Sequence, residues 1–192
     1  MSSLFTPSAP TEATEAIDPA TQLARWADEE AQVRSRLAPP GVARPEQLAG
    51  RSGLQVFAAI SAGELPSPPI GHSLDFCPIT FGPGHFVFQG RPSARYLNPL
   101  GTVHGGWIAT LLDSAVGCAM HTMLPADVGY TTAELKISYV RALTPAVGLV
   151  RAEGRVINTG RRLGFAEGRL IGPDGKLYAH ATTTCAVLTP GV

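Results

Sequence analysis

One stretch constrains the fold of this chain more than any other, residues 105–120, which reads as a helix of about four turns. Its side chains are almost all apolar or small, in the order GGWIATLLDSAVGCAM. A helix that is apolar on most sides is normally buried, so other parts of the chain must enclose it. A single carboxylate, Asp113, stands in its middle. Because a buried charge is costly unless it is paired or used, Asp113 is a candidate functional residue.

The start of this helix suits a developing negative charge. Helix N-termini present unpaired N–H groups and a partial positive charge, which stabilise an oxyanion. Gly105 and Gly106 stand at that end, and without Cβ atoms they let a ligand carbonyl approach the backbone. The alternative for the two glycines is a tight loop without a ligand, and for His104 it is a structural role in that loop.

The spacing between Gly105 and Asp113 predicts a dimer. The two residues are eight positions apart, about 12 Å along a helix, whereas one reacting carbon needs both groups at roughly 3 Å. Two antiparallel copies of the helix, related by a two-fold axis, meet this requirement. If Asp113 is catalytic and the Gly105 N–H is its oxyanion donor, the site spans a subunit interface. Otherwise Asp113 is an ordinary helix carboxylate, solvated or bound to a neighbouring backbone group.

Small residues share the side of the helix that carries Asp113. At spacings of four and seven its neighbours are Gly106, Ala109, Gly117 and Met120. Three of these four are small, so this face is expected to leave room for a ligand or a second backbone.

The text around the helix predicts strands. Two are expected before it, near 73–81 and 85–91, and four after it, near 132–141, 147–158, 162–172 and 176–188. In the first of the later four, Ala133 and Leu135 alternate with polar Thr132 and Glu134, the pattern of a half-buried strand. Strand, strand, long apolar helix and four hairpin-linked strands predict an α+β domain whose antiparallel sheet wraps around the helix.

The N-terminal part reads differently. Residues 1 to about 18 are rich in Ser, Thr, Ala, Pro and Glu and are expected to be disordered. The text DPATQLARWADEEAQVRSRL from Asp18 predicts an amphipathic helix that ends at Pro39-Pro40-Gly41 and braces the body. A second short helix is expected at about 52–62. We therefore expect an N-terminal extension, 1–52, and a main domain, 53–190.

Composition excludes several functional classes. Fifteen basic and fifteen acidic residues give a formal charge of zero, which favours neither nucleic acid nor a membrane surface as a partner. Cys77, Cys118 and Cys185 form no C-x-x-C pair, which predicts free thiols, a reducing compartment and no zinc site. Without a leader pattern or a long apolar run, we expect a cytoplasmic protein that does not span a membrane.

Residues 98–119, NPLGTVHGGWIATLLDSAVGCA, resemble the signature of hotdog-fold acyl-CoA thioesterases of the phenylacetate-degradation (PaaI-like) type. The family pattern is an Asn, then Gly-x-x-His-Gly-Gly, then an apolar run that ends in Asp. Here these fall at Asn98, Gly101, 104–106 and Asp113. The resemblance continues through ELKISYVRAL, NTGRRLGFAEGRL and GKLYAHATTTCAV, and it implies the hotdog fold for about residues 53–188.

The resemblance also implies roles for individual residues. Asp113 would be the nucleophile or general base, and the Gly105 N–H would be the oxyanion donor from the partner subunit. Asn98 and His104 would orient water, the leaving thiol or the carbonyl.

Further roles concern the strand after the helix and coenzyme A. The family often places a hydroxyl at the start of that strand, which points to Thr132, with Thr131 as the alternative. Arg161 and Arg162 stand at a strand start, where guanidinium groups can hold phosphates, unless they are a solvated hairpin pair. Gly106 joins them as a substrate-binding residue.

The sequence thus predicts a hydrolase, an acyl-CoA thioesterase that acts on aryl or medium-chain acyl groups as a homodimer or homotetramer. Thioesters are good electrophiles, so no metal or organic cofactor is demanded, and coenzyme A is part of the substrate. One alternative is a non-catalytic acyl-CoA binder or sensor, which has no need for a carboxylate in mid-helix. Another is a hotdog hydratase, which would use a different Asp/His dyad.

Overall fold

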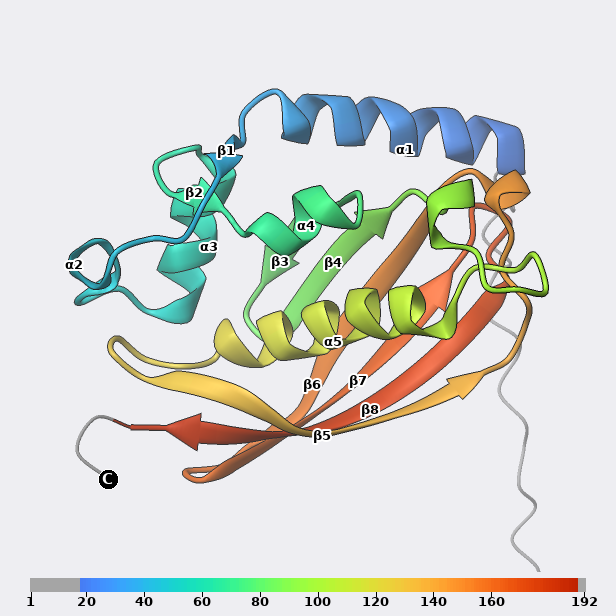
Figure 1. Cartoon of the computed structure of the whole chain (residues 1–192). Coiled ribbons are helices and arrows are strands. Elements are labelled where there is room, and N and C mark those ends of the chain that lie inside the picture. The colour runs from blue at the N-terminus through green and yellow to red at the C-terminus, as the bar shows by residue number, and fades with distance from the viewer. Residues whose placement is uncertain (1–17, 190–192) are drawn as a thin grey trace, which may run out of the picture.

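The computed structural model describes residues 18–189, and its main feature is a curved sheet around one long helix (Figure 1). The helix is α5 (Gly105–His121), and the six antiparallel strands follow the order β3-β4-β6-β7-β8-β5. The strands are β3 (Phe76–Gly82), β4 (His85–Gly90), β5 (Gly129–Tyr139), β6 (Val150–Thr159), β7 (Leu163–Ile171) and β8 (Leu177–Leu188). The α+β architecture predicted from the sequence is confirmed.

Helix α5 is buried because its apolar side chains meet the concave face of the sheet. Leu111, Leu112 and Val116 are fully inaccessible to solvent. The sheet approaches the helix closely at Gly154, where an added Cβ would lie 2.2 Å from the carbonyl oxygen of Ala115. Glycine is therefore required at this position of β6, and the helix lies directly against the strand.

Strand β5 forms one edge of the sheet, beside β8, and it contains a bulge. Thr132 is paired with Cys185 and Glu134 with Thr184, which leaves Ala133 as an extra residue without a partner in β8. A regular pleat would place Thr132 and Glu134 on the same outer face, as the alternating sequence predicts. The extra residue inverts the faces, so Thr132 points towards α5.

The N-terminal region contains more elements than the sequence predicted. The two expected helices are α1 (Pro19–Arg34), capped by Asp18, and α3 (Gly53–Ser61), capped by Ser52. The proline-rich segments of this region also form short elements, namely β1 (Ala38–Pro40), α2 (Pro45–Leu48), β2 (Pro66–Ser67) and α4 (Pro69–Ser73). Later in the chain, single 3₁₀ turns lie at Ala94–Tyr96 and Pro145–Val147. The disorder expected for the start of the chain concerns residues that lie almost wholly outside the described range. The division at residue 52 stays a prediction.

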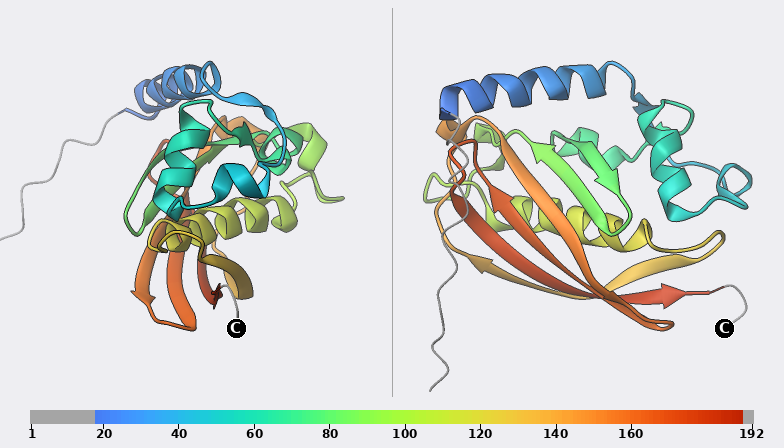
Figure 2. Two further views of the ribbon diagram at one scale, coloured as in Figure 1. Left: turned by 90° about the vertical axis from the view of Figure 1, so that its left-hand side faces the viewer. Right: turned by 180° about the vertical axis from the view of Figure 1, so that it is seen from behind.

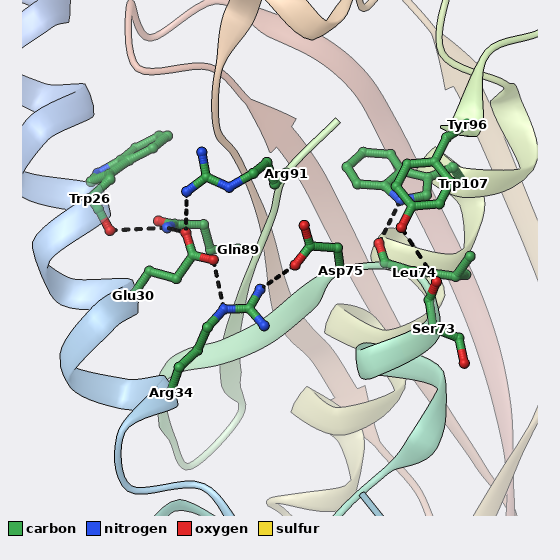
Figure 3. Close-up of polar contacts among 10 residues, drawn as sticks. All are labelled: Trp26, Glu30, Arg34, Ser73, Leu74, Asp75, Gln89, Arg91, Tyr96 and Trp107. Atoms are coloured by element: carbon green, nitrogen blue, oxygen red, sulfur yellow. Dashed lines mark hydrogen bonds and ion pairs between the residues drawn. The ribbon is translucent and has the colours of Figure 1, made fainter. Parts of the chain in front are cut away.

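Helix α1 is fastened to the sheet by buried polar side chains (Figure 3). Gln89 of β4 is fully buried, and its Nε2 donates to the carbonyl oxygen of Trp26 and to Glu30, both at 3.0 Å. Glu30, which is 5% exposed, also accepts from Arg34 at 2.7 Å and from Arg91 at 3.1 Å. Removing one member would leave a buried charge or amide unpaired, which makes this network a strong anchor.

Arg151 of β6 adds a second anchor for α1. Its guanidinium lies 4.4 Å above the Trp26 ring, donates to Gln89 at 2.9 Å and pairs with Glu29. Burial raises the pKa of Glu29, but the hydrogen bonds and charges of Arg151 and Arg25 outweigh this effect, so that its pKa lies below the ordinary value. In both views of Figure 2, α1 lies across the end of the molecule away from α5.

Within residues 18–189, no helix has the length and apolar character needed to cross a membrane.

Candidate active site

Asp113 and Thr132 meet beside the middle of α5. The Thr132 Oγ1 donates a hydrogen bond of 2.9 Å to the Asp113 Oδ1, and both side chains are half-buried. The neighbouring Thr131 is exposed, because the bulge at Ala133 assigns Thr132, and not Thr131, to the helix side. The sequence proposed this hydroxyl for the site, and its catalytic role stays a prediction.

The pair lines a cavity of about 470 Å³. Helix α5 contributes Ser114 and Cys118 in addition to Asp113, and β5 contributes Tyr130 in addition to Thr132. The opposite wall comes from 34–40, 67–72 and the start of β3, which are distant in sequence. A cavity of this size fits the usual volume range of small-molecule sites.

The thiols in this cavity are not basic groups. Burial, followed by the charge of Asp113, raises the pKa of Cys118 to about 12, against the hydrogen bond with Tyr130. Burial likewise raises the pKa of Cys77 to about 12. Both thiols are free, as expected, and remain protonated near neutral pH, so neither is an activated nucleophile. The carboxylate of Asp113 is the basic group that α5 presents to the cavity.

The small-residue face of α5 is largely occupied by neighbouring strands, which is one of the two outcomes expected from helical spacing. At Gly117 an added Cβ would lie 2.9 Å from the phenol of Tyr130, and Met120 is fully buried with its methyl group against Gly164. The room expected at these positions is filled by the chain's own strands, because spacing along a helix carries no information on what packs against it. The helix residues that line the cavity are Asp113 itself, the next residue, Ser114, and Cys118.

The start of α5 is organised by His104. Its Nδ1 accepts a hydrogen bond of 2.8 Å from the Gly106 N–H, which makes His104 the N-cap of the helix. The Tyr139 hydroxyl donates to the Gly105 carbonyl at 3.0 Å, and an added Cβ on Gly105 would lie 3.0 Å from the Tyr139 ring. Among the described residues, the Gly105 N–H has no acceptor, so it is a free donor at the helix end.

Asn98 shapes the loop that leads to this helix. Its Oδ1 accepts from the N–H groups of Leu100 at 2.9 Å and Thr102 at 3.2 Å, and its Nδ2 donates to the Thr102 hydroxyl at 2.8 Å. The turn that these bonds close has Gly101 at φ 78°, a conformation that favours glycine. The observed role of Asn98 is thus local, and a role towards substrate stays a prediction.

One chain does not bring all the predicted site residues together. Gly105 lines a separate hollow of about 220 Å³ with Tyr139, and His104 lines another of about 350 Å³ with Gly106. Arg161 and Arg162 are exposed and line a fourth hollow, of about 920 Å³. Residues that follow the C-terminal end of α5 line the same hollow. Gly105 and Asp113 therefore face different spaces within a protomer, in accord with the spacing argument.

The sequence reasoning missed the wall of the Asp113 cavity that is formed by 34–40 and 67–72. Both segments are rich in proline, which signals a break in regular structure but not where the chain goes next. It also missed Tyr130, whose position on the cavity depends on the same bulge that reorients Thr132.

Comparisons with known proteins agree with this architecture. The family model for the thioesterase superfamily matches residues 100–179. The protein named "Putative esterase VNG_1336C" of Halobacterium salinarum is 40% identical over 84 residues, 43% of this chain, and the match spans about half, 54%, of that protein's length. "Putative esterase F42H10.6" of Caenorhabditis elegans is 30% identical over 122 residues, which are 62% of this chain and 70% of that protein.

A solved structure gives the same result. The crystal structure of a thioesterase-type protein related to phenylacetic acid degradation, from Ralstonia eutropha JMP134, matches with a TM-score of 0.63 and 29% identity. The match covers 98% of that protein but 68% of this chain, so about a third of this chain has no counterpart there. The chain therefore belongs to the thioesterase superfamily, as a member of its phenylacetate-degradation (PaaI) type with the hotdog fold.

Proposed function

We propose that this protein is an acyl-CoA thioesterase, which hydrolyses the thioester to a free acid and coenzyme A. The observation that supports this most is the Asp113–Thr132 hydrogen bond in the wall of a cavity, within a thioesterase-family fold. Thr132 engages one carboxylate oxygen of Asp113 and so holds the carboxylate in place beside the cavity. Asp113 either attacks the carbonyl carbon directly or removes a proton from an attacking water.

The tetrahedral intermediate would need an oxyanion donor, and the Gly105 N–H is a free donor at the start of α5. Collapse of the intermediate breaks the carbon–sulfur bond and releases the thiolate of coenzyme A, which takes up a proton. In the nucleophilic route, water then cleaves the acyl–Asp113 anhydride. Neither route requires a metal or an organic cofactor, because the thioester is itself a good electrophile.

The proposed site is completed across a homodimer, and β5 supports this. One end of this edge strand contacts Asp113 through Thr132, and the other end contacts Gly105 through Tyr139. Edge strands have unpaired backbone groups that can pair with a second chain. Antiparallel pairing of two β5 strands about a two-fold axis near Leu135 would bring the Thr132 end of one copy beside the Tyr139 end of the other.

The remaining predicted residues would serve the rest of the substrate. Arg161 and Arg162 are exposed and can reach the anionic phosphates of coenzyme A. His104 and Asn98 hold the donor end of α5 in place and would orient water or the thiol, and Gly106 leaves room beside them. Pairing of dimers into a tetramer and a cytoplasmic location remain predictions.

The test is an assay of the purified protein against a panel of acyl-CoAs, with free thiol release as the readout. Asp113→Asn is expected to lower kcat by about 10²–10⁴, the usual contribution of a positioned acid–base group. Ser114→Ala is the matched control, because Ser114 lies next to Asp113 on the same cavity and its hydroxyl bonds to the Thr110 carbonyl. Near-normal turnover in the Asp113 variant would sink the proposal.

The alternative, a non-catalytic acyl-CoA binder, gives a different outcome in the same experiment. The wild type would then release no thiol from any acyl-CoA, yet calorimetry would report tight binding that survives Asp113→Asn.

A further inference from the structure

The cavity that contains Asp113 extends from the candidate chemistry to a part of the chain that lies outside the match to the family model. Asp113 and Thr132 line it in the middle of α5, and Leu37, Pro39, Pro40 and Ile70 line it as well. We call residues 34–40 the arm; it begins at the last residue of α1 and precedes the 100–179 match to the family model. The matched solved structure is covered almost completely by two thirds of this chain, so the remaining third offers features of its own.

The arm is a fixed wall. Its backbone pairs in parallel with 66–67, and the Ser67 hydroxyl donates to the Ala38 carbonyl at 3.0 Å. Pro39 and Pro40 each have a restricted φ, which stiffens this part of the arm.

The first residue of the arm is tied to the neighbouring cavity wall. Arg34 bonds to Glu30 of α1 at 2.7 Å and to Asp75 at 2.8 Å (Figure 3), and Asp75 immediately precedes β3, whose first residues line the cavity. The arm is thus anchored at both of its ends, by an ion-pair network and by strand pairing.

Helix α4 completes this wall and is anchored separately. The carbonyl of Leu74, directly after α4, accepts from the Trp107 indole at 2.8 Å, and the carbonyl of Ser73 accepts from Tyr96 at 3.3 Å (Figure 3). Ile70 of α4 lines the cavity, yet it is 48% exposed, so its side chain can be changed without opening the core.

We infer that the arm and α4 together determine which acyl groups this enzyme accepts, by closing the end of the acyl pocket away from Asp113. This inference rests on the proposed function and names the substrate class for the same site. The occupant is the apolar acyl group, because Leu37, Ile70 and prolines predominate in the wall. Of its polar side chains, Arg34 is already paired with two carboxylates, Ser67 bonds to the Ala38 carbonyl, and His72 is exposed. The pocket thus sets an upper limit on acyl length.

The experiment measures kcat/KM for straight-chain acyl-CoAs of increasing length. The readout is the long-to-short ratio, which is kcat/KM for a long acyl chain divided by kcat/KM for a short one. Ile70→Trp narrows the closed end and is expected to lower this ratio, whereas Ile70→Ala widens it and is expected to raise the ratio. Each shift is expected to be about tenfold, because a change of a methylene or two in an apolar pocket is worth roughly 10–200-fold in discrimination. Val42→Trp is the control, since Val42 follows the arm, is 83% exposed and does not line the cavity.

A second variant tests the anchoring of the arm. Asp75→Asn weakens the contact with Arg34 while tolerating the local backbone, because Asp75 has φ 54° and asparagine adopts this conformation readily. Loosening the arm is expected to raise the long-to-short ratio in the same direction as Ile70→Ala, and by less.

The outcomes separate this inference from the proposed function. If the wild type hydrolyses acyl-CoAs and the Ile70 variants keep the wild-type length profile, the inference is wrong and the proposed function stands. If the wild type hydrolyses no acyl-CoA, the proposed function fails. Calorimetry of the same variants with free fatty acids of increasing length then decides, and equal length dependence in all of them overturns the inference.

Discussion

The two parts of the candidate site on α5 are built in different ways. At the start of the helix, the side chains of His104 and Asn98 bond to backbone groups no more than four residues away. In the middle, Asp113 takes its hydrogen bond from Thr132, 19 residues away, and its cavity is walled by the distant arm. The donor end is therefore shaped mainly by its own loop, with one distant contact from Tyr139, whereas the carboxylate end depends on the packed sheet and on the docked N-terminal region.

The two parts also differ in how they lie relative to the family match. The donor end lies wholly within or beside residues that match the family, because the family model begins at residue 100. The carboxylate end combines a family residue, Asp113, with the arm, which lies outside that match. Our two proposals thus assign chemistry to residues within or beside the family match and selectivity to the arm outside it.

The largest effect is expected for Gly105→Pro, which disables the donor end alone because it removes the free N–H of Gly105. The first helical position tolerates proline, and His104 has φ −61° and ψ 135°, the extended conformation that a following proline requires. Loss of an oxyanion donor is expected to lower kcat by about 10²–10³. Gly105→Ala is the control, since it adds a Cβ at the same contact with Tyr139 but keeps the N–H. An equal loss in both variants would contradict the donor role.

Mixed dimers show whether the two ends come from different chains. Asp113→Asn and Gly105→Pro are co-expressed with different tags, and each mixed dimer then contains one site with both functional groups. Random pairing is expected to restore roughly a quarter of the wild-type activity. Absence of any recovery in purified mixed dimers would mean that the site lies within one protomer.

Next in size is Thr132→Val, which removes the hydroxyl that bonds to Asp113 and keeps the shape of the side chain. A hydrogen bond to a charged group is worth about 1.5–3 kcal/mol, so kcat/KM is expected to fall roughly ten- to hundredfold. Thr131→Val should leave it near the wild-type value, because that side chain is exposed on the other face. Steady-state kinetics with one acyl-CoA distinguishes the two, and a larger loss at Thr131 would reverse the assignment.

A smaller effect is expected for His104→Ala, which removes the N-cap of α5. The cost is about 1 kcal/mol in the free energy of unfolding, measured by urea denaturation. His104→Asn supplies another capping side chain and is expected to recover most of this stability. If turnover recovers with it, the imidazole acts through the helix end; if turnover stays low in a stable protein, the imidazole acts on the substrate.

The smallest effect is expected for the stability of the fold at low pH, which depends in part on the ion pair between Glu29 of α1 and Arg151. The folded pKa of Glu29 lies below its ordinary value of 4.5, so the pair with Arg151 stabilises the fold above that pH. This contribution is expected to disappear as the pH falls through 4.5 towards the folded pKa. Melting temperatures between pH 6 and pH 3 should fall less steeply in Glu29→Gln than in the wild type, and a parallel decline in both would show that Glu29 does not contribute.

Sequence reasoning recovered what is set by local pattern and fixed geometry. The bounds of α5 agreed with the apolar run to within a residue or two, and the helical rise alone predicted that Gly105 and Asp113 face different spaces. It did not predict the extra residue, Ala133, that inverts the faces of β5 and turns Thr132 towards α5. It also failed at the arm, because proline-rich text has no periodicity from which a packing partner can be inferred.

The bulge at Ala133 has an evolutionary consequence. Successive residues of a strand point to opposite faces of the sheet. One inserted codon therefore exchanges the two faces for every residue of the strand beyond the insertion. Tyr130 and Thr132 lie beyond the bulge and both reach the cavity. A phenol and a hydroxyl on this cavity can therefore be acquired or lost by a change in length, with no substitution at either residue.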